Sequence, residues 1–293
     1  MGQALDCVRR AHPDLGAERA EEFGSGWDNF AIKISARRGE FVFRFPRRQV
    51  ALDFLRQETQ LLPELAPHLG VPIPRPLGWV HVPEGFAWPF AGYPLLPGTT
   101  ADRLRCDRAT RERLAAPLGR FLRQLHDLDP RDFPVAPDAI RRLDLAYRIG
   151  FTEERWPRFC DLGLADETLL RRVVDELPDP GRWRAGAEAV VHGDLYARHL
   201  LLDRDRQLCG VIDWGDAHAG DPAGDLALAA TFLGAAARRT FFEHYGPVSA
   251  ETWSVARFKG LMYLVALGLY GADIGDDDLL WECARWSEAL EGG

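Results

Sequence analysis

The chain has 293 residues, 46% of them hydrophobic, and a formal net charge of −8, so it is long enough for one large or two modest domains with packed cores. Its five cysteines form no CxxC pair, which argues against a disulfide framework and a zinc site and favours a reducing cytoplasm. The N-terminal residues show no secretory signal, and no apolar run reaches the ~20 residues of a membrane span. We therefore expect a cytoplasmic protein whose partner is neither a membrane nor a nucleic acid.

The first third of the chain indicates a small lobe rich in strands. An opening helix is predicted over Gly2–Arg10 and another helical turn around Ala17–Glu22, and residues 24–29 are typical of a turn between strands. Leucines at helical spacing predict a helix over Val50–Leu65. The predicted strands are, in chain order, Ala31–Ser35, Glu40–Phe45, Gly78–Val82 and Ala91–Leu96.

After Gly98 the pattern becomes mostly helical. The predicted helices are Arg108–Leu128, Leu143–Gly150, Glu167–Leu177, Pro222–Ala237 and Arg257–Tyr270. Two short apolar strands interrupt them near residues 190 and 210. The order of elements predicts an α+β chain, in which a small β-rich N-terminal lobe (1–97) ends in a hinge (93–98) and a larger, mostly helical lobe follows (98–293).

Two carboxylates stand 19 residues apart, Asp194 and Asp213, each close to a short apolar run. Phosphoryl transfer from a nucleotide needs such a pair, because one Asp orients the attacking hydroxyl and accepts its proton while the other holds the magnesium that neutralises the phosphates. A turn Asp and a strand-end Asp without chemistry are the alternative. The hairpin between the two acids favours the kinase interpretation.

The motif His192-Gly193-Asp194-x4-His199, with Ile212-Asp213-Trp214-Gly215-Asp216, resembles the aminoglycoside and macrolide phosphotransferases. Gly220–Ala227, Gly24–Pro46 and the Tyr93–Gly98 hinge are also similar to that family, so the resemblance covers nearly the whole chain. These small-molecule kinases are distantly related in fold to protein kinases. The resemblance therefore implies a two-lobed, protein-kinase-like fold, with the nucleotide bound by the N-terminal lobe and the acceptor by the C-terminal lobe.

In this family Asp194 would be the catalytic base that positions the acceptor hydroxyl, and Gly193 would permit the tight backbone beside it. Asp213 would be the magnesium ligand, since a hard cation prefers carboxylate oxygen. His199 stands where many kinases carry an Asn that binds a second metal ion. Direct metal ligation by His199 and hydrogen bonding to phosphate or Asp213 both stay open.

Arg44 stands on the strand where kinases usually place a phosphate-binding Lys. Glu58, 14 residues later on the following helix, is expected to pair with it, and an Arg there can hold carboxylate and phosphate together. A surface strand Arg is the alternative. Lys33 lies one strand too early to take this role.

The nucleotide contacts fall in two segments. The backbone N–H groups of Gly24, Ser25 and Gly26 could cover the phosphates, although Gly-Ser-Gly is simply a turn in most proteins. By resemblance, the carbonyl of Pro94 and the N–H of Leu96 would bind the purine edge, with Tyr93 as gatekeeper. ATP and GTP are both compatible with this hinge.

Acceptor recognition, by resemblance, falls to the C-terminal lobe, where residues 98–293 hold 33 acidic against 25 basic side chains. The candidate ligands for ammonium groups are Asp216, Asp273, Asp276, Asp277, Asp278 and Glu282. A solvated acidic helix surface is the alternative. Trp281 and Trp286 could offer cation–π contacts or core packing, and helix capping explains Asp221 and Asp225 without any function.

We therefore expect an O-phosphotransferase with Mg²⁺ as cofactor and ATP or GTP as donor, acting as a monomer on a small cationic molecule. An aminoglycoside comes first because the acidic segment favours a polycation, a macrolide is close behind, and a choline or sugar kinase is third. A pseudokinase scaffold is the alternative from another class. Arg44 and His199, which depart from the usual kinase residues, favour the scaffold, and the joint presence of Asp194, Asp213 and Glu58 argues against it.

Overall fold

The computed structural model describes residues 2–25, 29–80, 88–186 and 188–292. The chain divides into two compact units: unit 1 comprises Met1–His68, Pro72–Pro97 and Ile212–Asp216, and unit 2 comprises Leu69–Val71, Gly98–Val211 and Ala217–Gly293. The expected fold class is confirmed, because an antiparallel β-sheet is followed by a mostly helical region. Within the described ranges, no helix has the length and apolarity that a membrane crossing requires.

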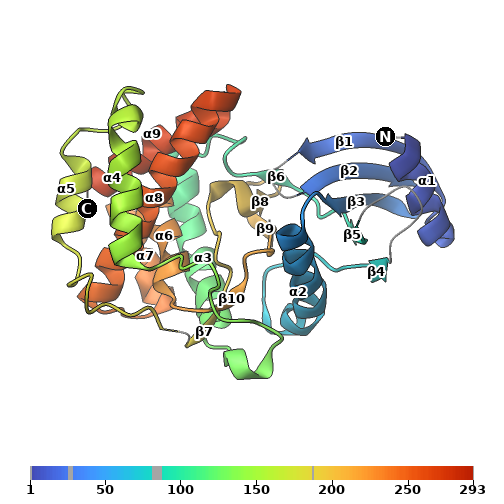
Figure 1. The fold of residues 1–293 in the computed structure, drawn as a ribbon, viewed down its shortest axis with the longest axis horizontal. Helices are drawn as coiled ribbons and strands as arrows, with labels where there is room; N and C mark the ends of the chain where they lie inside the picture. The colour runs from blue at the N-terminus through green and yellow to red at the C-terminus, as the bar shows by residue number, and fades with distance from the viewer. Residues whose placement is uncertain (1, 26–28, 81–87, 187, 293) are drawn as a thin grey trace. The chain divides into compact units, whose positions relative to one another are not determined.

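Unit 1 is built on a five-stranded antiparallel sheet in the order β1-β2-β3-β5-β4 (Figure 1). The strands are β1 (Ala17–Ser25), β2 (Asn29–Ala36), β3 (Gly39–Pro46), β4 (Trp79–Val80) and β5 (Phe90–Pro94). Side chains alternate between the two faces of a strand, so Ile32 and Ile34 of β2 and Phe43 of β3 are buried on one face. Residues 17–22 form strand and not the expected helical turn, because β2 pairs with them and supplies their backbone hydrogen bonds.

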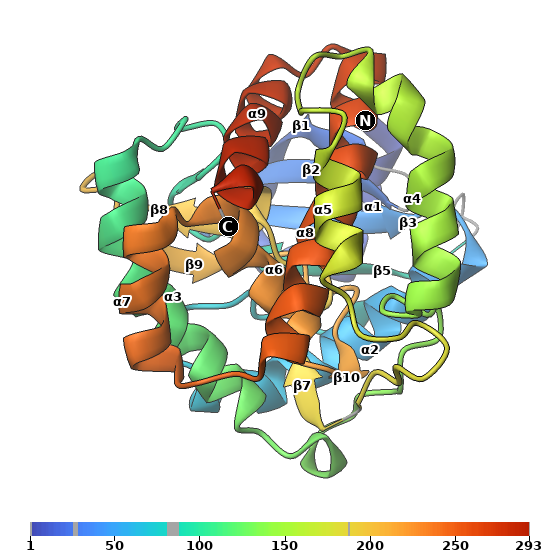
Figure 2. The same cartoon turned by 90° about the vertical axis from the view of Figure 1, so that its left-hand side faces the viewer.

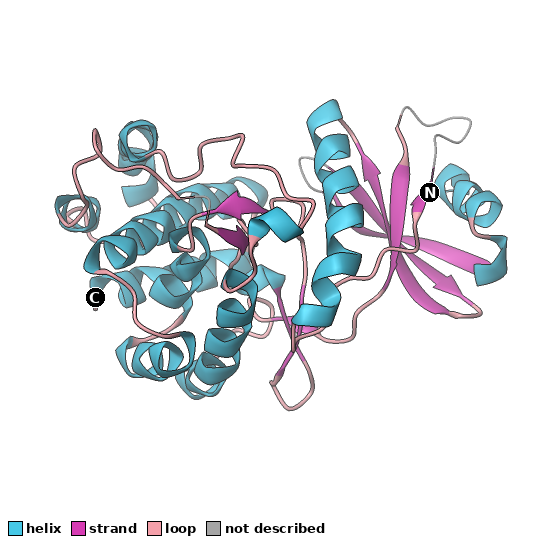
Figure 3. Cartoon of the chain, turned by 90° about the horizontal axis from the view of Figure 1, so that it is seen from below, coloured by secondary structure: helices cyan, strands magenta, loops and turns pink. Residues whose placement is uncertain are grey.

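Two helices cover this sheet. Helix α1 (Gly2–Ala11) packs Cys7 and Val8 into the same apolar cluster as Ile32 and Phe43. Helix α2 (Gln49–Leu65) buries leucines at helical spacing, as the sequence predicted, and carries the buried Glu58 on the same side. Figure 3 shows α1 and α2 on opposite faces of the sheet. Glu58 is thereby held against the sheet face on which Arg44 of β3 lies.

Unit 2 is mainly helical (Figure 2). Its helices are α3 (Arg108–His126), α4 (Leu145–Cys160), α5 (Leu169–Asp175), α6 (Ala223–Phe232), α7 (Ala235–Tyr245), α8 (Ala250–Ile274) and α9 (Asp277–Glu291). Every residue of α6 is buried, so this mostly apolar helix forms the centre against which α8 and α9 pack. The single helix expected over Pro222–Ala237 is two helices, because the chain becomes extended at Leu233 and Gly234 caps a new helix.

Two small sheets in unit 2 present the loop of Asp194. One pairs β7 (Ala189–Val191) with β10 (His218–Gly220), and the other has the order β6 (Thr99–Thr100), β8 (Leu200–Leu202) and β9 (Leu208–Val211). All residues of β7, β8 and β10 are buried. The loop between β7 and β8 is therefore fixed at both ends by strands of the core.

Candidate active site

The loop from β7 to β8 carries Asp194, and its backbone is tightly turned. Gly193 has a φ of +83°, which residues other than glycine rarely adopt, and Ala197–His199 form a 3₁₀ turn. The side chain of Asp194 is 31% exposed, although the strands on either side are buried. The carboxylate of Asp194 is thus partly exposed, whereas its backbone is held between two buried strands.

The beginning of this loop is held by Asp225, a buried carboxylate in the first turn of α6. Its Oδ2 accepts a hydrogen bond from the backbone N–H of His192 at 2.7 Å, and its Oδ1 accepts one from Gly193 at 2.9 Å. Burial alone would raise the pKa of Asp225, but the hydrogen bond from His126 and the adjacent donors hold this pKa below its ordinary value. The ionised carboxylate orients two consecutive peptide groups immediately before Asp194.

Three side chains from other helices extend this support. His126 Nε2, at the end of α3, lies 3.1 Å from Asp225 Oδ2, and His126 Nδ1 lies 2.8 Å from the hydroxyl of Tyr245. Because a carboxylate only accepts, Nε2 carries the proton that is shared with Asp225. Tyr263 of α8 donates to the carbonyl of Gly193 at 3.2 Å. Helices α3, α6, α7 and α8 therefore all hold the loop.

His199 closes the loop from within. Its Nδ1 lies 2.6 Å from the carbonyl oxygen of Asp194 and 3.9 Å from Asp194 Oδ2. The ring is buried and packs against Tyr196 with 4.4 Å between ring centroids. Donation from Nδ1 to the carbonyl leaves Nε2 as the ring nitrogen with which His199 could bind a metal ion.

Unit 1 contains the second group of candidate residues, joined by Arg44. Arg44 Nη1 donates to Glu58 Oε2 at 2.8 Å, and its Nη2 donates to Asp213 Oδ1 at 3.0 Å. Glu58 is only 2% exposed, whereas the side chain of Asp213 is 46% exposed. The pair expected between Arg44 and Glu58 forms, and the same guanidinium also orients the carboxylate of Asp213.

The electrostatics of this group follow from burial and charge. Burial opposes the charge on Arg44, but the carboxylates of Glu58 and Asp213 outweigh it and raise the Arg44 pKa. Burial raises the pKa of Glu58, although Arg44 counteracts this effect. Asp213 has φ of +66°, a left-handed conformation that costs a non-glycine residue about 1–3 kcal/mol.

The expected nucleotide contacts lie in unit 1 with Arg44, apart from Gly26, which falls outside the described residues. Gly24 and Ser25 are the last residues of β1 and pair with Ala31 and Phe30 of β2. Tyr93 is buried, and both burial and the Glu58 carboxylate raise its pKa well above the ordinary value, so its hydroxyl stays protonated. The hinge follows directly: Pro94 is exposed and Leu96 is half-buried.

Comparison with known proteins identifies the family. The model of the phosphotransferase enzyme family matches residues 19–258, which is most of the chain. The chain belongs to this family. It is a phosphotransferase enzyme with the fold of small-molecule kinases.

Solved structures of two kinds of phosphotransferase are similar to this chain. The GDP and kanamycin complex of APH(2")-IIia is 26% identical with a TM-score of 0.70, covering 99% of each chain. The macrolide 2'-phosphotransferase MphH from Brachybacterium faecium is 26% identical with a TM-score of 0.61, covering 100% of this chain and 99% of that one. The uncharacterized protein YcbJ of Bacillus subtilis (strain 168) is 25% identical over 239 residues, which cover 73% of this chain and 70% of that protein.

The acidic residues expected to bind the acceptor of this phosphotransferase are mostly paired with arginines. The pairs are Asp273 with Arg158, Asp276 with Arg198, Asp278 with Arg105, and Glu282 with Arg111. Glu282 is fully buried and accepts a further hydrogen bond from Trp286 at 2.8 Å, so both residues belong to the core and not to the expected acceptor surface. Asp277 is exposed in the first turn of α9 and forms no ion pair with any described residue. Asp216, the remaining candidate, lies in unit 1.

A magnesium ion of a phosphotransferase fits the donor atoms of Asp213. Within the described ranges, no three His, Cys, Asp or Glu side chains gather to hold a metal ion. Magnesium in kinases is bound by one or two carboxylates together with substrate phosphates and water, so a complete protein cage is not needed. The half-exposed carboxylate of Asp213, oriented by Arg44, suits this mode of binding.

Sequence reasoning missed Asp225 as part of this site. The capping role expected for both acids belongs to Asp221, which accepts from the N–H groups of Ala223 at 2.9 Å and Gly186 at 3.1 Å. Asp225 instead binds the loop of Asp194. The available signal was a carboxylate inside an otherwise apolar helix, where a buried charge must have a partner.

Proposed function

We propose that this phosphotransferase moves the terminal phosphoryl group of GTP or ATP to a hydroxyl group of a cationic small molecule, and that the acceptor is an aminoglycoside. The observation that carries the proposal is the loop of Asp194, whose carboxylate is partly exposed while Asp225 and Tyr263 fix its backbone. A rigid, half-exposed carboxylate is what a reaction needs when positioning supplies most of the rate.

In this proposal Asp194 binds the acceptor hydroxyl and accepts its proton as the oxygen–phosphorus bond forms. Proton transfer of this kind contributes about 10²–10⁴-fold to rate. His199 holds the Asp194 carbonyl and so limits rotation of the residue. The division of the loop into a fixed backbone and an exposed carboxylate supports this role.

The nucleotide would be bound by unit 1. Arg44 would hold the phosphates, with Glu58 fixing the guanidinium, and residues 24–26, Pro94 and Leu96 would contact phosphates and purine. Asp213 and His199 are the residues that we propose for magnesium, which when bound would neutralise charge on the phosphates. The hydrogen bond between Arg44 and Asp213 supports this arrangement, because the guanidinium that would bind the phosphates also orients the carboxylate that would bind the metal ion.

Similarity to the kanamycin complex supports an aminoglycoside as acceptor. A macrolide is the second candidate, and the arginine pairs of the C-terminal acids favour it. Arginines compensate Asp273, Asp276 and Asp278, which leaves Asp277 as the carboxylate best placed for an ammonium group. Asp277, which forms no ion pair with any described residue, suits the single dimethylamino group of a macrolide better than it suits a polycation.

A nucleoside-diphosphate release assay with magnesium tests the proposal. GTP and ATP are each offered with kanamycin, a macrolide, choline and glucose, and the rate is compared with that of nucleotide alone. Stimulation by kanamycin is the expected result. Stimulation by the macrolide alone would identify a macrolide as the acceptor in place of an aminoglycoside. Stimulation by choline or glucose alone would refute both the aminoglycoside and the macrolide.

A further inference from the structure

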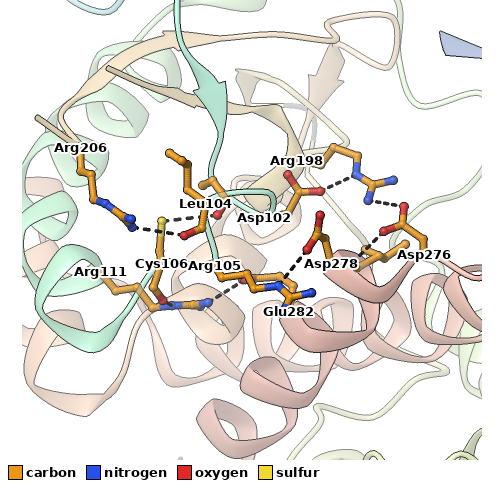
Figure 4. A network of polar contacts seen from close by, with 12 residues as sticks. Asp102, Leu104, Arg105, Cys106, Arg111, Arg198, Arg206, Asp276, Asp278 and Glu282 are labelled. Atoms are coloured by element: carbon orange, nitrogen blue, oxygen red, sulfur yellow. Dashed lines mark hydrogen bonds and ion pairs between the residues drawn. The ribbon is translucent and has the colours of Figure 1, made fainter. Parts of the chain in front are cut away.

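Arg198 lies in the loop of Asp194, next to His199, and takes no part in the proposed chemistry. Its Nε donates to Asp102 Oδ2 at 2.7 Å, and its Nη2 donates to Asp276 Oδ2 at 2.8 Å. Figure 4 shows the guanidinium between these two carboxylates. Asp102 comes shortly after β6, and Asp276 is the N-cap of α9. The end of the loop is thus bound to two segments distant in sequence.

The charges of this group depend on one another. Asp102 is 1% exposed, and its Oδ1 is buried without a hydrogen-bond partner among the described residues, so the bond to Arg198 compensates its charge. Burial opposes the charge on Arg198, but Asp102 and Asp276 raise the Arg198 pKa. A planar guanidinium can donate to two carboxylates at once in a fixed geometry, which an ammonium cannot do.

We propose that Arg198 is a positioning residue, which fixes the end of the loop and thereby the places of His199 and Asp194; this inference rests on the proposed phosphoryl transfer. Asp225 holds the peptide groups at the beginning of the loop, and Arg198 holds the opposite end. We call Arg198, Asp102 and Asp276 the Arg198 clamp. Without the clamp, the short turn that carries His199 would be held only by strand β8 and by the contacts of His199 itself, and would shift more easily.

The clamp also connects the loop to the helix that carries the proposed acceptor contact. The Oδ1 of Asp276 accepts from the N–H of Leu279 at 3.0 Å and so caps α9, while its Oδ2 accepts from Arg198. Asp277 follows in the first turn of α9. The carboxylate of Asp276 therefore joins the start of α9 to the loop of Asp194, so a shift of the loop would also displace the start of α9.

The test compares Arg198→Lys and Arg198→Gln with a matched control, Arg105→Gln. Arg105 also pairs with a carboxylate in this region, Asp278 of α9 at 2.8 Å, but does not contact the loop (Figure 4). Hydrogen–deuterium exchange of amides 193–199 is measured in the protein without ligands. Magnesium-dependent nucleotide hydrolysis and acceptor phosphorylation are measured in parallel.

Both Arg198 variants should exchange the loop amides about tenfold faster than wild type, because local opening becomes easier when one end is released. Their kcat should fall about tenfold or more while the KM for nucleotide stays within about twofold, since misplacement affects the reacting geometry. Arg105→Gln should match wild type in loop exchange and in kcat.

Two results would overturn the proposal: unchanged loop exchange in both variants, or faster exchange with full kcat. If Arg198→Gln fails to fold because Asp102 is left buried without a partner, the double variant Arg198→Gln/Asp102→Asn removes both charges and should still show the faster exchange. Faster exchange in a protein that phosphorylates none of the acceptors would refute the proposed acceptors while leaving the clamp intact.

Discussion

Asp225→Asn tests whether the charge of Asp225, and not only its shape, is needed to hold the loop of Asp194. Asparagine has nearly the same shape as aspartate but one acceptor oxygen fewer and no charge. Asp225 accepts from three donors: the N–H groups of His192 and Gly193, and His126 Nε2. In the variant the amide NH₂ must face at least one of these donors.

The magnitude follows from the donors that lose a partner. One buried N–H left without an acceptor costs about 1–3 kcal/mol, and loss of charge assistance weakens the remaining bonds, so we expect a total of about 2–4 kcal/mol. For a unit of this size each kcal/mol lowers Tm by about 2–4 °C, which gives a fall of about 4–16 °C. A loop displaced by about 1 Å would lower kcat about 10²-fold.

Thermal unfolding and steady-state phosphorylation measure these two effects. Asp221→Asn is the matched control, because Asp221 precedes the same helix and accepts two backbone N–H groups that do not belong to the loop. The control should keep its kcat and lose at most about 1 kcal/mol of stability. Wild-type values of both Tm and kcat in Asp225→Asn would show that this carboxylate does not orient the loop.

Two further predictions concern the nucleotide side and pH. Arg44→Lys keeps the positive charge, but a lysine cannot hold Glu58 and Asp213 together. The protein should still fold, and its kcat/KM for nucleotide should fall about 10–10²-fold. An unaltered kcat/KM would show that the double contact does not matter for catalysis. The folded-state pKa of Asp225 is lowered, so its contribution to stability is complete above the unfolded pKa of about 3.9 and is lost as pH falls below it. The difference in Tm between wild type and Asp225→Asn should therefore be constant above about pH 5 and narrow below pH 4, and a difference that widened in acid would contradict the direction of this pKa.

Much of the fold was predictable because local patterns and tertiary packing agree. The leucines of α2 have helical spacing, and β2 and β3 alternate in the way that a sheet with one buried face requires. Residues 17–22 misled the prediction because their acidic, polar sequence has little strand character. Pairing with β2 decides their structure, and that partner cannot be deduced from the segment itself.

The candidate site was predictable where sequence motifs carry it and not where distant residues meet. Asp194, Asp213, Arg44 and Glu58 stand at spacings that indicate phosphoryl transfer. The contacts of Asp225 with His126, and of Arg198 with Asp102 and Asp276, join residues 78 to 99 positions apart. The same limit explains Glu282, whose charge indicated a surface but whose partner, Arg111, lies 171 residues away in the core.

The role of Asp194 in phosphoryl transfer is tested by following the terminal phosphate itself. Wild type and Asp194→Asn are incubated with GTP or ATP labelled at the γ-phosphate, magnesium and kanamycin, and the label on the acceptor is counted alongside nucleotide affinity. We expect labelled acceptor with wild type, a loss of about 10²–10⁴-fold in Asp194→Asn, and nucleotide affinity that stays within about twofold. Equal transfer of label by both proteins would show that Asp194 is not the catalytic base.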